Sequence, residues 1–267
     1  MFFYFPLWQG SGTTDELYSG VEYLYENLRD RFEFEIVPEF DTSGSEKKNK
    51  ILNYDVLLKD LRLFKECLFQ KDPDMLFTLG GDCSFCIVTI SYLLKKYPGM
   101  SIIWIDAHGD LNRPESSPSA TLHGMPLRVL IGDGDKSFTD ICSTNMPIEN
   151  LIKVGTRDLD QPEVEYIGEN NVCMIDGNNE PSSIIEQALN KSNDKVYLHV
   201  DLDVLDPEVF RHVKCLAPGG LTRNTLVDVL RGVTEKREVV GGSVTEYTGS
   251  EPEDAKYIGE IMRIMSS

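Results

Sequence analysis

A short apolar run that ends in alternating polar residues constrains the fold of this chain more than any other feature. Residues 102–105 are hydrophobic, and a run of this length between polar residues is typical of a strand buried on both faces. Asp106, His108 and Asp110 follow at two-residue spacing, so in an extended chain their side chains point the same way. Two carboxylates and an imidazole are suitable ligands for Mn, Fe or Zn. The spacing alone is equally compatible with a metal site and with a solvated acidic loop that contains a histidine without a role.

A second stretch has the same design and favours the metal interpretation. Residues 196–200 again have the character of a buried strand, and Asp201 and Asp203 follow them. Burying a carboxylate without a partner is costly, so two acid-tipped strands in one chain indicate one shared cation site. Together with Asp106 and Asp110, these acids can neutralise two divalent ions. The sequence therefore favours a two-metal centre that activates a water molecule.

Strand and helix patterns alternate along the whole chain. We expect strands at residues 2–7, 34–37, 75–79, 102–106, 151–154, 172–176, 196–203 and 239–246. We expect helices at residues 15–31, 54–70, 85–97, 125–130, 182–192, 222–235 and 253–265, with Thr222 as a cap. No repeat or Pro/Ser-rich linker interrupts the pattern. It predicts a single α/β domain over residues 1–267, with a mostly parallel sheet covered by helices on both faces.

Acidic clusters stand at the carboxyl ends of five of the expected strands. Their first residues are Asp82, Asp106, Asp158, Asp201 and Glu246, and the clusters also include Asp110, Asp160 and Asp203. In open parallel α/β folds, the functional site lies beyond the carboxyl ends of the strands. Five separate placements therefore predict the site at one edge of the sheet.

The composition excludes some classes of partner. The net charge is −18, from 26 basic and 44 acidic residues, which argues against a nucleic acid or an anionic membrane. The charge mainly favours solubility and attracts a cationic substrate only weakly. No stretch is long and apolar enough to span a membrane, and the apolar start is too short for a signal peptide. Six scattered cysteines are expected to be free thiols in a reducing compartment, the cytoplasm.

The order of motifs between about residues 75 and 247 resembles the ureohydrolases, the family of arginase, agmatinase and formimidoylglutamase. The resemblance is carried by Gly-Gly-Asp-x-Ser at 80–84, Asp-Ala-His-Gly-Asp at 106–110, His-Gly at 123–124, Asp-Leu-Asp-Val-Leu-Asp-Pro at 201–207, and Glu246. Pro-Gly-Gly-Leu-Thr at 218–222 is also similar to a loop of the family. The resemblance implies a three-layer α/β fold, two Mn²⁺ ions per chain and hydrolysis of a guanidino or related C–N bond.

The resemblance also implies roles for individual residues. The expected metal ligands are Asp106, His108, Asp110, Asp201 and Asp203, with Asp106 and Asp201 as bridges. His123 is expected to exchange protons with solvent, and Asp110 to relay a proton to the leaving amine. Glu246 is expected to pair with the guanidinium. Without the resemblance, His123 reads as a structural loop residue and Glu246 as a surface ion-pair partner.

Three loop residues resemble arginase rather than agmatinase. Asn112 and Ser119 occupy positions where arginases contact an α-carboxylate, and Asp160 occupies the position of an acid that contacts the α-amino group. Each is also compatible with ordinary polar loop chemistry. Arginine is therefore the lead substrate, followed by other small cationic guanidino or formimino compounds. The family often forms trimers or hexamers, so a homo-oligomer is possible.

Two positions depart from the family pattern. Cys83 stands where the family usually has a histidine that binds one metal. Its thiolate could ligate and shift preference toward Zn or Fe, it could stand back and leave a weaker site, or activity could be lost. The last outcome gives the alternative function, a metal-poor relative that binds an amino acid or a protein partner without catalysis.

The second departure is His199, where the family often has serine. We expect it to point toward the site and to orient a carboxylate ligand through a hydrogen bond, although a satisfied core histidine is about as compatible with the sequence. Direct ligation by His199 is not expected. Cys83 and Cys86 match the C-x-x-C spacing but lack a second pair, so zinc-ribbon chemistry is not expected. No role is assigned to His212.

Overall fold

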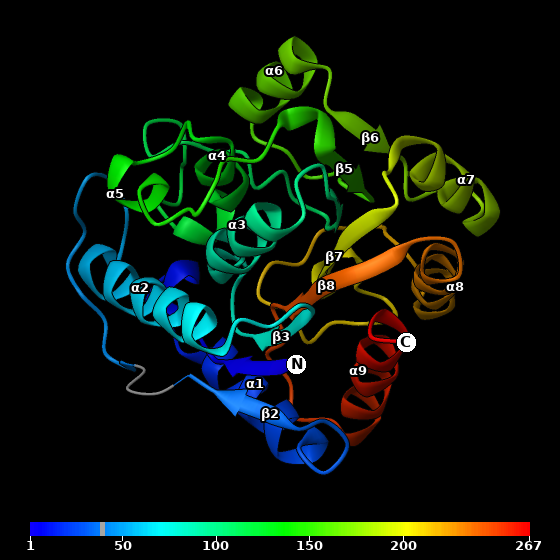
Figure 1. Ribbon diagram of the computed structural model, residues 1–267, viewed down its shortest axis with the longest axis horizontal. Coiled ribbons are helices and arrows are strands. Elements are labelled where there is room, and N and C mark those ends of the chain that lie inside the picture. Colours follow the sequence, from blue (N-terminus) through cyan, green and yellow to red (C-terminus); the bar gives the residue numbers. More distant parts are fainter. Residues whose placement is uncertain (38–40) are drawn as a thin grey trace.

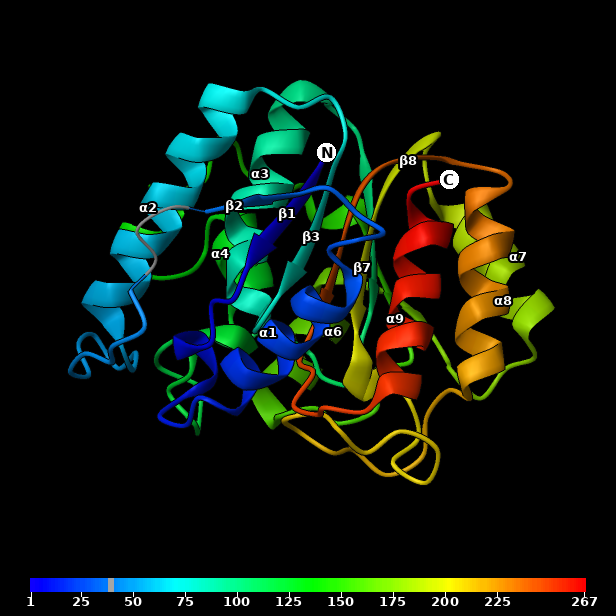
Figure 2. The same ribbon diagram turned by 90° about the horizontal axis from the view of Figure 1, so that it is seen from below.

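A computed structural model describes residues 1–37 and 41–267 and has a central sheet with helices on both faces (Figures 1 and 2). The eight strands lie in the order β2-β1-β3-β8-β7-β4-β5-β6, and all their pairings are parallel. Their bounds are β1 Phe2–Phe5, β2 Phe34–Ile36, β3 Leu76–Gly80, β4 Ser101–Ile105, β5 Leu151–Val154, β6 Cys173–Ile175, β7 Lys195–Asp201 and β8 Glu238–Thr245. The predicted α/β class and parallel sheet are confirmed.

Helices form two layers. The bounds are α1 Glu16–Leu28, α2 Tyr54–Lys71, α3 Cys86–Lys96, α4 Pro126–Ile131, α5 Lys136–Thr139, α6 Gln161–Asn170, α7 Pro181–Lys191, α8 Arg223–Thr234 and α9 Pro252–Met265. Helices α2, α3 and α4 pack on one face of the sheet, and α1, α7, α8 and α9 pack on the other (Figure 2). Each face has its own hydrophobic core, as buried strands with apolar side chains on both sides require.

The structure contains two helices that the sequence pattern did not predict. Helix α6 buries little more than Glu163, so it lacks the apolar stripe by which amphipathic helices are identified. Helix α5 has four residues, too few to show a helical period. The predicted cap of α8 is confirmed, because the Thr222 hydroxyl accepts a hydrogen bond of 3.1 Å from the Thr225 amide.

The strand register brings the site-bearing ends together. Val200 of β7 is paired with Ile105 of β4 on one side and with Val244 of β8 on the other. Val244 in turn is paired with Leu79 of β3. The carboxyl ends of β3, β8, β7 and β4 therefore meet at the middle of one edge of the sheet, where the sequence placed the functional site.

The expectation that the site residues continue extended strands is wrong in detail. Strand β4 ends at Ile105, and Asp110 adopts a left-handed backbone conformation with φ of 56°. Strand β7 ends at Asp201, and the next residues form a 3₁₀ turn. Glu246, just after β8, also has a positive φ of 69°. Turning side chains from four strands toward one point requires a change of backbone direction that simple alternation does not provide.

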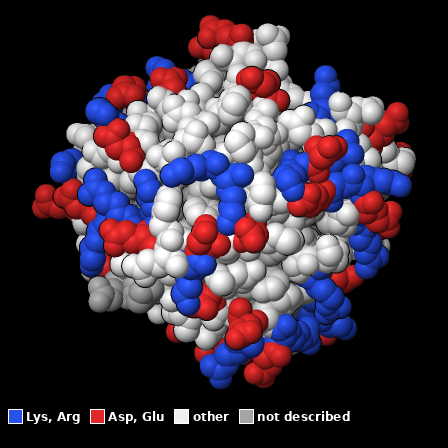
Figure 3. All heavy atoms as spheres, viewed as in Figure 1, with Lys and Arg blue, Asp and Glu red and all other residues white. Residues whose placement is uncertain are grey.

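Surface charge is mixed on the face shown in Figure 3, where lysines and arginines are interspersed with acidic side chains. Among the described residues, no helix has the length and apolar character needed to cross a membrane.

Candidate metal centre

One group of possible metal ligands lies where β4 and β7 end. It consists of Asp106, His108 and Asp203, whose ligand atoms all lie within 4.8 Å of one another. His108 Nδ1 is 2.8 Å from Asp203 Oδ2. The backbone holds both carboxylates, because the His108 amide donates to Asp106 Oδ1 at 2.7 Å and the Ala107 amide donates to Asp203 Oδ1 at 3.1 Å. The group is rich in oxygen, which suits Mn²⁺.

A second group lies beside the first and consists of Cys83, His199 and Asp201, again within 4.8 Å. The Cys83 thiol donates to Asp201 Oδ2 at 3.2 Å, and its Sγ lies 3.4 Å from His199 Nε2 and 3.2 Å from Thr245 Oγ1. The two groups are linked, because the Asp203 amide donates to Asp201 Oδ1 at 2.9 Å. All three side chains are buried.

His199 has a fixed orientation. Its Nδ1 lies 2.8 Å from Ser243 Oγ and 3.5 Å from Cys86 Sγ. Its ring stacks on Trp104, with ring centroids 3.6 Å apart. The hydrogen bond to a carboxylate that we expected is absent among the described residues; the partners of the ring are two thiols and a hydroxyl. Burial lowers the pKa of His199 to about 3, so the imidazole is neutral.

A buried lysine lies next to the first group and was not identified from the sequence. Lys153 of β5 is fully buried, donates to the His108 carbonyl at 2.7 Å, and lies 3.5 Å from Asp106 Oδ2. The Trp104 indole donates to the same carboxylate oxygen at 2.6 Å. A charged residue inside the apolar run of residues 151–154 was the available signal, because a buried ammonium needs an acidic partner.

Asp110 provides a test of whether a cation fits here. Its Oδ2 is buried and has no hydrogen-bond partner among the described residues. Such an oxygen is costly unless a ligand completes it. Burial and the neighbouring charge of Asp106 raise the pKa of Asp110. The two donor groups and this unpartnered oxygen therefore fit divalent cations.

The other titratable groups respond to the same crowding of negative charge. Burial and the charge of Asp106 raise the pKa of Asp203 to about 6. Burial would raise the pKa of Asp106 too, but Lys153 and His108 outweigh it and lower that pKa below its usual value. Burial lowers the pKa of His108, but its bond to Asp203 prevails and raises the value to about 9. Burial and Asp201 raise the pKa of Cys83, so without a cation it is a thiol.

His123 and Glu246 form a separate pair. His123 Nδ1 lies 3.0 Å from Glu246 Oε1, while Glu246 Oε2 is buried without a hydrogen-bond partner among the described residues. Burial lowers the pKa of His123, but the charge of Glu246 outweighs it and raises the pKa above its usual value. The pair therefore combines a proton-exchanging group with a carboxylate that can accept a further donor.

A cavity of about 250 Å³ connects these groups. Its walls include most of the predicted site residues: Cys83, His108, Asp110, Asn112, Ser119, His123, Asp160, Asp201 and Asp203. Asp106 and Glu246 do not line it, although Glu246 is in contact with His123, which does. The walls also contain Asp158, Glu163 and Cys215, to which we had assigned no role.

Three of the predicted substrate-binding residues, Asn112, Ser119 and Asp160, line the cavity. The Asn112 amide donates to Asp160 Oδ2 at 2.8 Å, and Ser119 Oγ lies 2.5 Å from Thr121 Oγ1. Glu163 anchors this part of the chain, because its carboxylate accepts from the amides of Leu111 and Asp160 at 2.9 and 3.0 Å.

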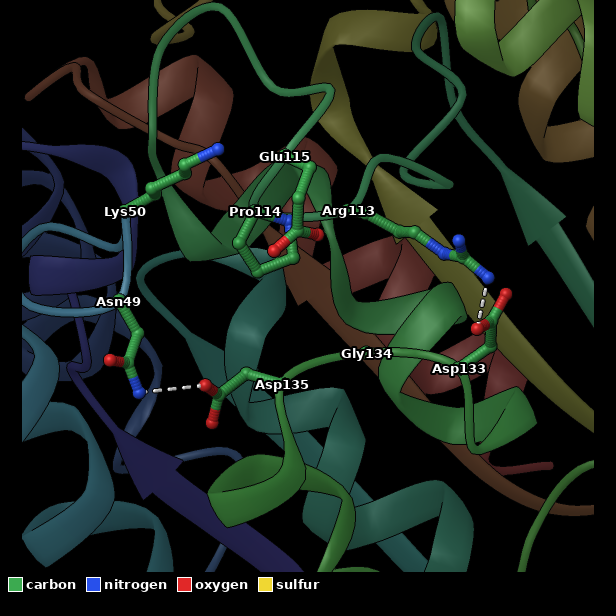
Figure 4. A pocket seen from close by; sticks show the side chains of 8 residues that line it. All are labelled: Asn49, Lys50, Arg113, Pro114, Glu115, Asp133, Gly134 and Asp135. Carbon is green, nitrogen blue, oxygen red and sulfur yellow. Dashed lines mark hydrogen bonds and ion pairs between the residues drawn. The ribbon is translucent and has the colours of Figure 1, made fainter.

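A second hollow, of about 440 Å³, is lined in part by Arg113, Pro114 and Glu115, the residues that follow Asn112 in the chain (Figure 4). Arg113 follows Asn112 directly and pairs with Asp133, and Asn49 donates to Asp135 at 3.1 Å. This hollow shares no lining residue with the cavity that contains the donor groups.

Comparison with known proteins identifies relatives of this chain. The profile of the Arginase family matches residues 51–256. The arginase of Staphylococcus aureus (strain MRSA252) is 37% identical over 186 residues, which cover 66% of this chain and 62% of that protein. The arginase of Plasmodium berghei (strain Anka) is 30% identical over 217 residues, or 74% of this chain and 60% of that protein. The matches thus span about three fifths of the length of these curated relatives.

Solved structures show the same architecture. The arginase of Entamoeba histolytica, solved in complex with L-ornithine, has a TM-score of 0.85 at 21% identity and covers 99% of this chain and 96% of its own. Formimidoylglutamase from Bacillus subtilis (strain 168) has a TM-score of 0.75 at 17% identity, over 99% and 86%. These two likenesses show the fold alone, whereas the profile extends over most of the chain. The chain belongs to the arginase family.

Proposed function

We propose that the protein is a metal-dependent hydrolase that cleaves a C–N bond of a linear amidine, with arginine as the first candidate and urea and an amine as products. The observation that carries this proposal is the placement of two adjoining donor groups at one cavity. Asn112, Ser119 and Asp160, which line that cavity, offer groups for the two polar ends of an α-amino acid.

The donor set supports two divalent ions. Asp106, His108 and Asp203 would hold one, and Asp201 with the groups near Cys83 would hold the other; the family resemblance suggests Mn²⁺ for both, with Zn²⁺ or Fe²⁺ as alternatives because of Cys83. When bound, two such ions supply a hydrolytic nucleophile by lowering the pKa of a water molecule. The unpartnered Asp110 Oδ2 would complete this cation site.

The protein residues would bind, orient and move protons. Glu246 has a free carboxylate oxygen that can accept from a guanidinium, which suits a cationic group with several donors. His123, bonded to Glu246 and lining the cavity, can exchange a proton with solvent. Asp110 would pass a proton to the leaving amine. Asn112 and Ser119 can donate to a carboxylate, and Asp160 can accept from an amino group.

The test is a screen for product release with the metal-loaded protein. Arginine is compared with agmatine, which lacks the α-carboxylate, and with formiminoglutamate. We expect the highest kcat/KM with arginine, and we expect Asn112→Ala and Ser119→Ala to raise KM for arginine while leaving that for agmatine nearly unchanged. Binding of arginine without turnover of any compound would instead favour the alternative, a non-catalytic relative.

Two further expectations belong to this proposal. A cytoplasmic location is supported by the six cysteines, which form no disulfide in the described part of the chain. A homo-oligomer is expected from the family resemblance, and light scattering of the purified protein measures it.

A further inference from the structure

We propose that Cys83, His199 and Asp201 form a thiolate–imidazole–carboxylate metal position that prefers Zn²⁺ or Fe²⁺ to Mn²⁺, with His199 as a direct ligand. The proposal deepens the proposed function and rests on it only in assuming that divalent ions bind at this end of the sheet. It revises our expectation from the sequence that His199 does not ligate.

The orientation of His199 is the first support. Ser243 Oγ lies 2.8 Å from His199 Nδ1, and this hydroxyl oxygen can accept a hydrogen bond from the Nδ1–H group. This arrangement leaves Nε2 with a free lone pair on the side of Cys83 and Asp201. Stacking on Trp104 restricts rotation of the ring. A hydrogen bond to the distal nitrogen, which fixes tautomer and ring orientation, is the usual support of a metal-binding histidine.

The spacing of the donor atoms is the second support. In a tetrahedral site with Zn–S of about 2.3 Å and Zn–N or Zn–O of about 2.1 Å, donor atoms lie roughly 3.6 Å apart. Cys83 Sγ lies 3.4 Å from His199 Nε2 and 3.2 Å from Asp201 Oδ2. A small outward movement of each side chain therefore accommodates the ion, without a change of strand register.

Binding exchanges a proton for a metal. The Cys83 thiol now donates to Asp201. When the ion enters, the S–H bond breaks, a metal–sulfur bond forms, and the proton leaves to solvent. The hydrogen bond between Cys83 and Asp201 therefore shows that the sulfur and the carboxylate oxygen already face each other, as two ligands of one ion must.

The charge balance among the expected ligands is the third support. Asp106, Asp110, Asp201 and Asp203 carry four negative charges, which two divalent ions neutralise. A Cys83 thiolate adds a fifth negative charge that would be left buried. Lys153 supplies the matching positive charge, because it is fully buried and lies 3.5 Å from Asp106. A buried charge is tolerated when an opposite charge accompanies it.

The chemistry of the donors sets the metal preference. Thiolate is a soft ligand that suits Zn²⁺ and Fe²⁺ and is poorly matched to Mn²⁺. The neighbouring group, Asp106, His108 and Asp203, contains no sulfur. The chain therefore offers two unlike metal positions within one centre.

Cobalt titration tests the proposal with a spectroscopic signal that does not depend on activity. Metal-free protein is titrated with Co²⁺ under anaerobic conditions while its absorption spectrum is recorded. We expect two equivalents to bind and a near-ultraviolet thiolate-to-cobalt band to saturate at one. Equimolar Zn²⁺ should remove the band, whereas equimolar Mn²⁺ should leave it.

Three variants assign the ligands. Cys83→Ser should abolish the band, and Cys86→Ala, the matched control at the neighbouring buried thiol, should keep it. His199→Gln should weaken Co²⁺ binding at the band-forming position by at least about tenfold, since even residues that only support a ligand cost that much. Circular dichroism confirms folding, and X-ray absorption of the zinc-loaded wild type, which needs no variant, should show one sulfur per two zinc ions.

The outcomes separate this proposal from the proposed function. Two equivalents of cobalt without a charge-transfer band would overturn the thiolate position and leave a dinuclear centre standing. Binding of no cobalt would overturn both. Unchanged cobalt affinity in His199→Gln would overturn the assignment of His199 as a ligand.

Discussion

The two donor groups of the centre contain one histidine each, and the two imidazoles have opposite character. Burial lowers the pKa of His199 to about 3, whereas Asp203 raises that of His108 to about 9. His199 is therefore already neutral at pH 7, while His108 is a cation that must lose its proton before it binds a metal. His199 is thus already in the protonation state that binds a metal, whereas His108 is held as a cation by carboxylates.

The difference follows from where each group sits on the sheet. His199 lies within β7, between neighbouring strands, and its partners are uncharged. His108 lies in the turn after β4, partly exposed, and faces carboxylates on both sides. Apart from Lys153, the buried interiors of the central strands carry apolar or uncharged side chains, whereas charged residues gather in the turns beyond the strand ends. We therefore expect changes in the first group to alter metal choice, and changes around the second to alter charge balance and turnover.

Asp110 belongs to neither group, and its replacement should have the largest effect. In Asp110→Asn the unpartnered oxygen loses its charge, so both cation binding and proton transfer to the leaving group suffer. We expect kcat to fall by about 10³-fold or more with the fold retained. Steady-state kinetics and circular dichroism of the metal-loaded variant measure this, and wild-type turnover would remove Asp110 from the mechanism.

Lys153→Met should be the most destabilising change in the metal-free protein. It leaves Asp106 buried without its cation, which costs about 3–5 kcal/mol when one partner of a buried pair is removed. Urea unfolding measures the loss. Lys195→Met is the matched control, since Lys195 is also a strand lysine with an acidic partner, Glu238, but is half-exposed. The control should cost less than about 1 kcal/mol, and equal costs would contradict the role given to Lys153.

The pH dependence of stability should distinguish the metal-free from the metal-loaded protein. The pKa of Asp203 is about 6 in the fold against 3.8 ordinarily, so the folded state binds this proton more tightly. The contribution of Asp203 to the free energy of unfolding is fully present below pH 3.8. About 3 kcal/mol of it is lost as pH rises from 3.8 to 6. His108, with a pKa of about 9, contributes stability that is lost as pH rises from 6.5 to 9.

Below pH 6.5 the effect of Asp203 is opposed by His199, whose pKa of about 3 makes the fold more stable as pH rises to 6.5. From pH 6.5 to pH 9 the effect of His108 remains, so the melting temperature of the metal-free protein should fall over that range. Divalent ions replace the protons on these ligands, so the metal-loaded protein should show a smaller fall over that range. Differential scanning calorimetry with and without metal makes the comparison. Parallel curves for the two forms would show that these groups are not the ligands.

The sequence predicted the sheet and the position of the site because both depend on local patterns. Apolar runs identified all eight strands, and the acids after them identified the edge where the site lies. It could not predict the contact between Glu246 and His123, because that contact depends on a positive φ after β8 and on packing between distant segments. It also could not show that the free nitrogen of His199 faces Cys83, since strand alternation gives a face but not the direction of a ring.

The smallest expected effect concerns replacement of the donor side chains at positions 83 and 199. Cys83→His alone should crowd the group, because Cys83 is buried with its sulfur 3.4 Å from His199, and overpacking of this kind costs about 1–3 kcal/mol. Adding His199→Ser makes room, since the ring beside the new imidazole is removed.

The double variant then holds an imidazole in place of the thiolate. We expect its stability to recover and its preference for Zn²⁺ over Mn²⁺ to fall about tenfold, a change of about 1.4 kcal/mol. Equilibrium dialysis against mixed Zn²⁺ and Mn²⁺, with metal content read by mass spectrometry, measures the preference. Cys86→Ala controls for loss of a nearby thiol and should keep the wild-type ratio. An unchanged ratio in the double variant would mean that sulfur does not set metal choice, and that the two halves of the centre differ in charge alone.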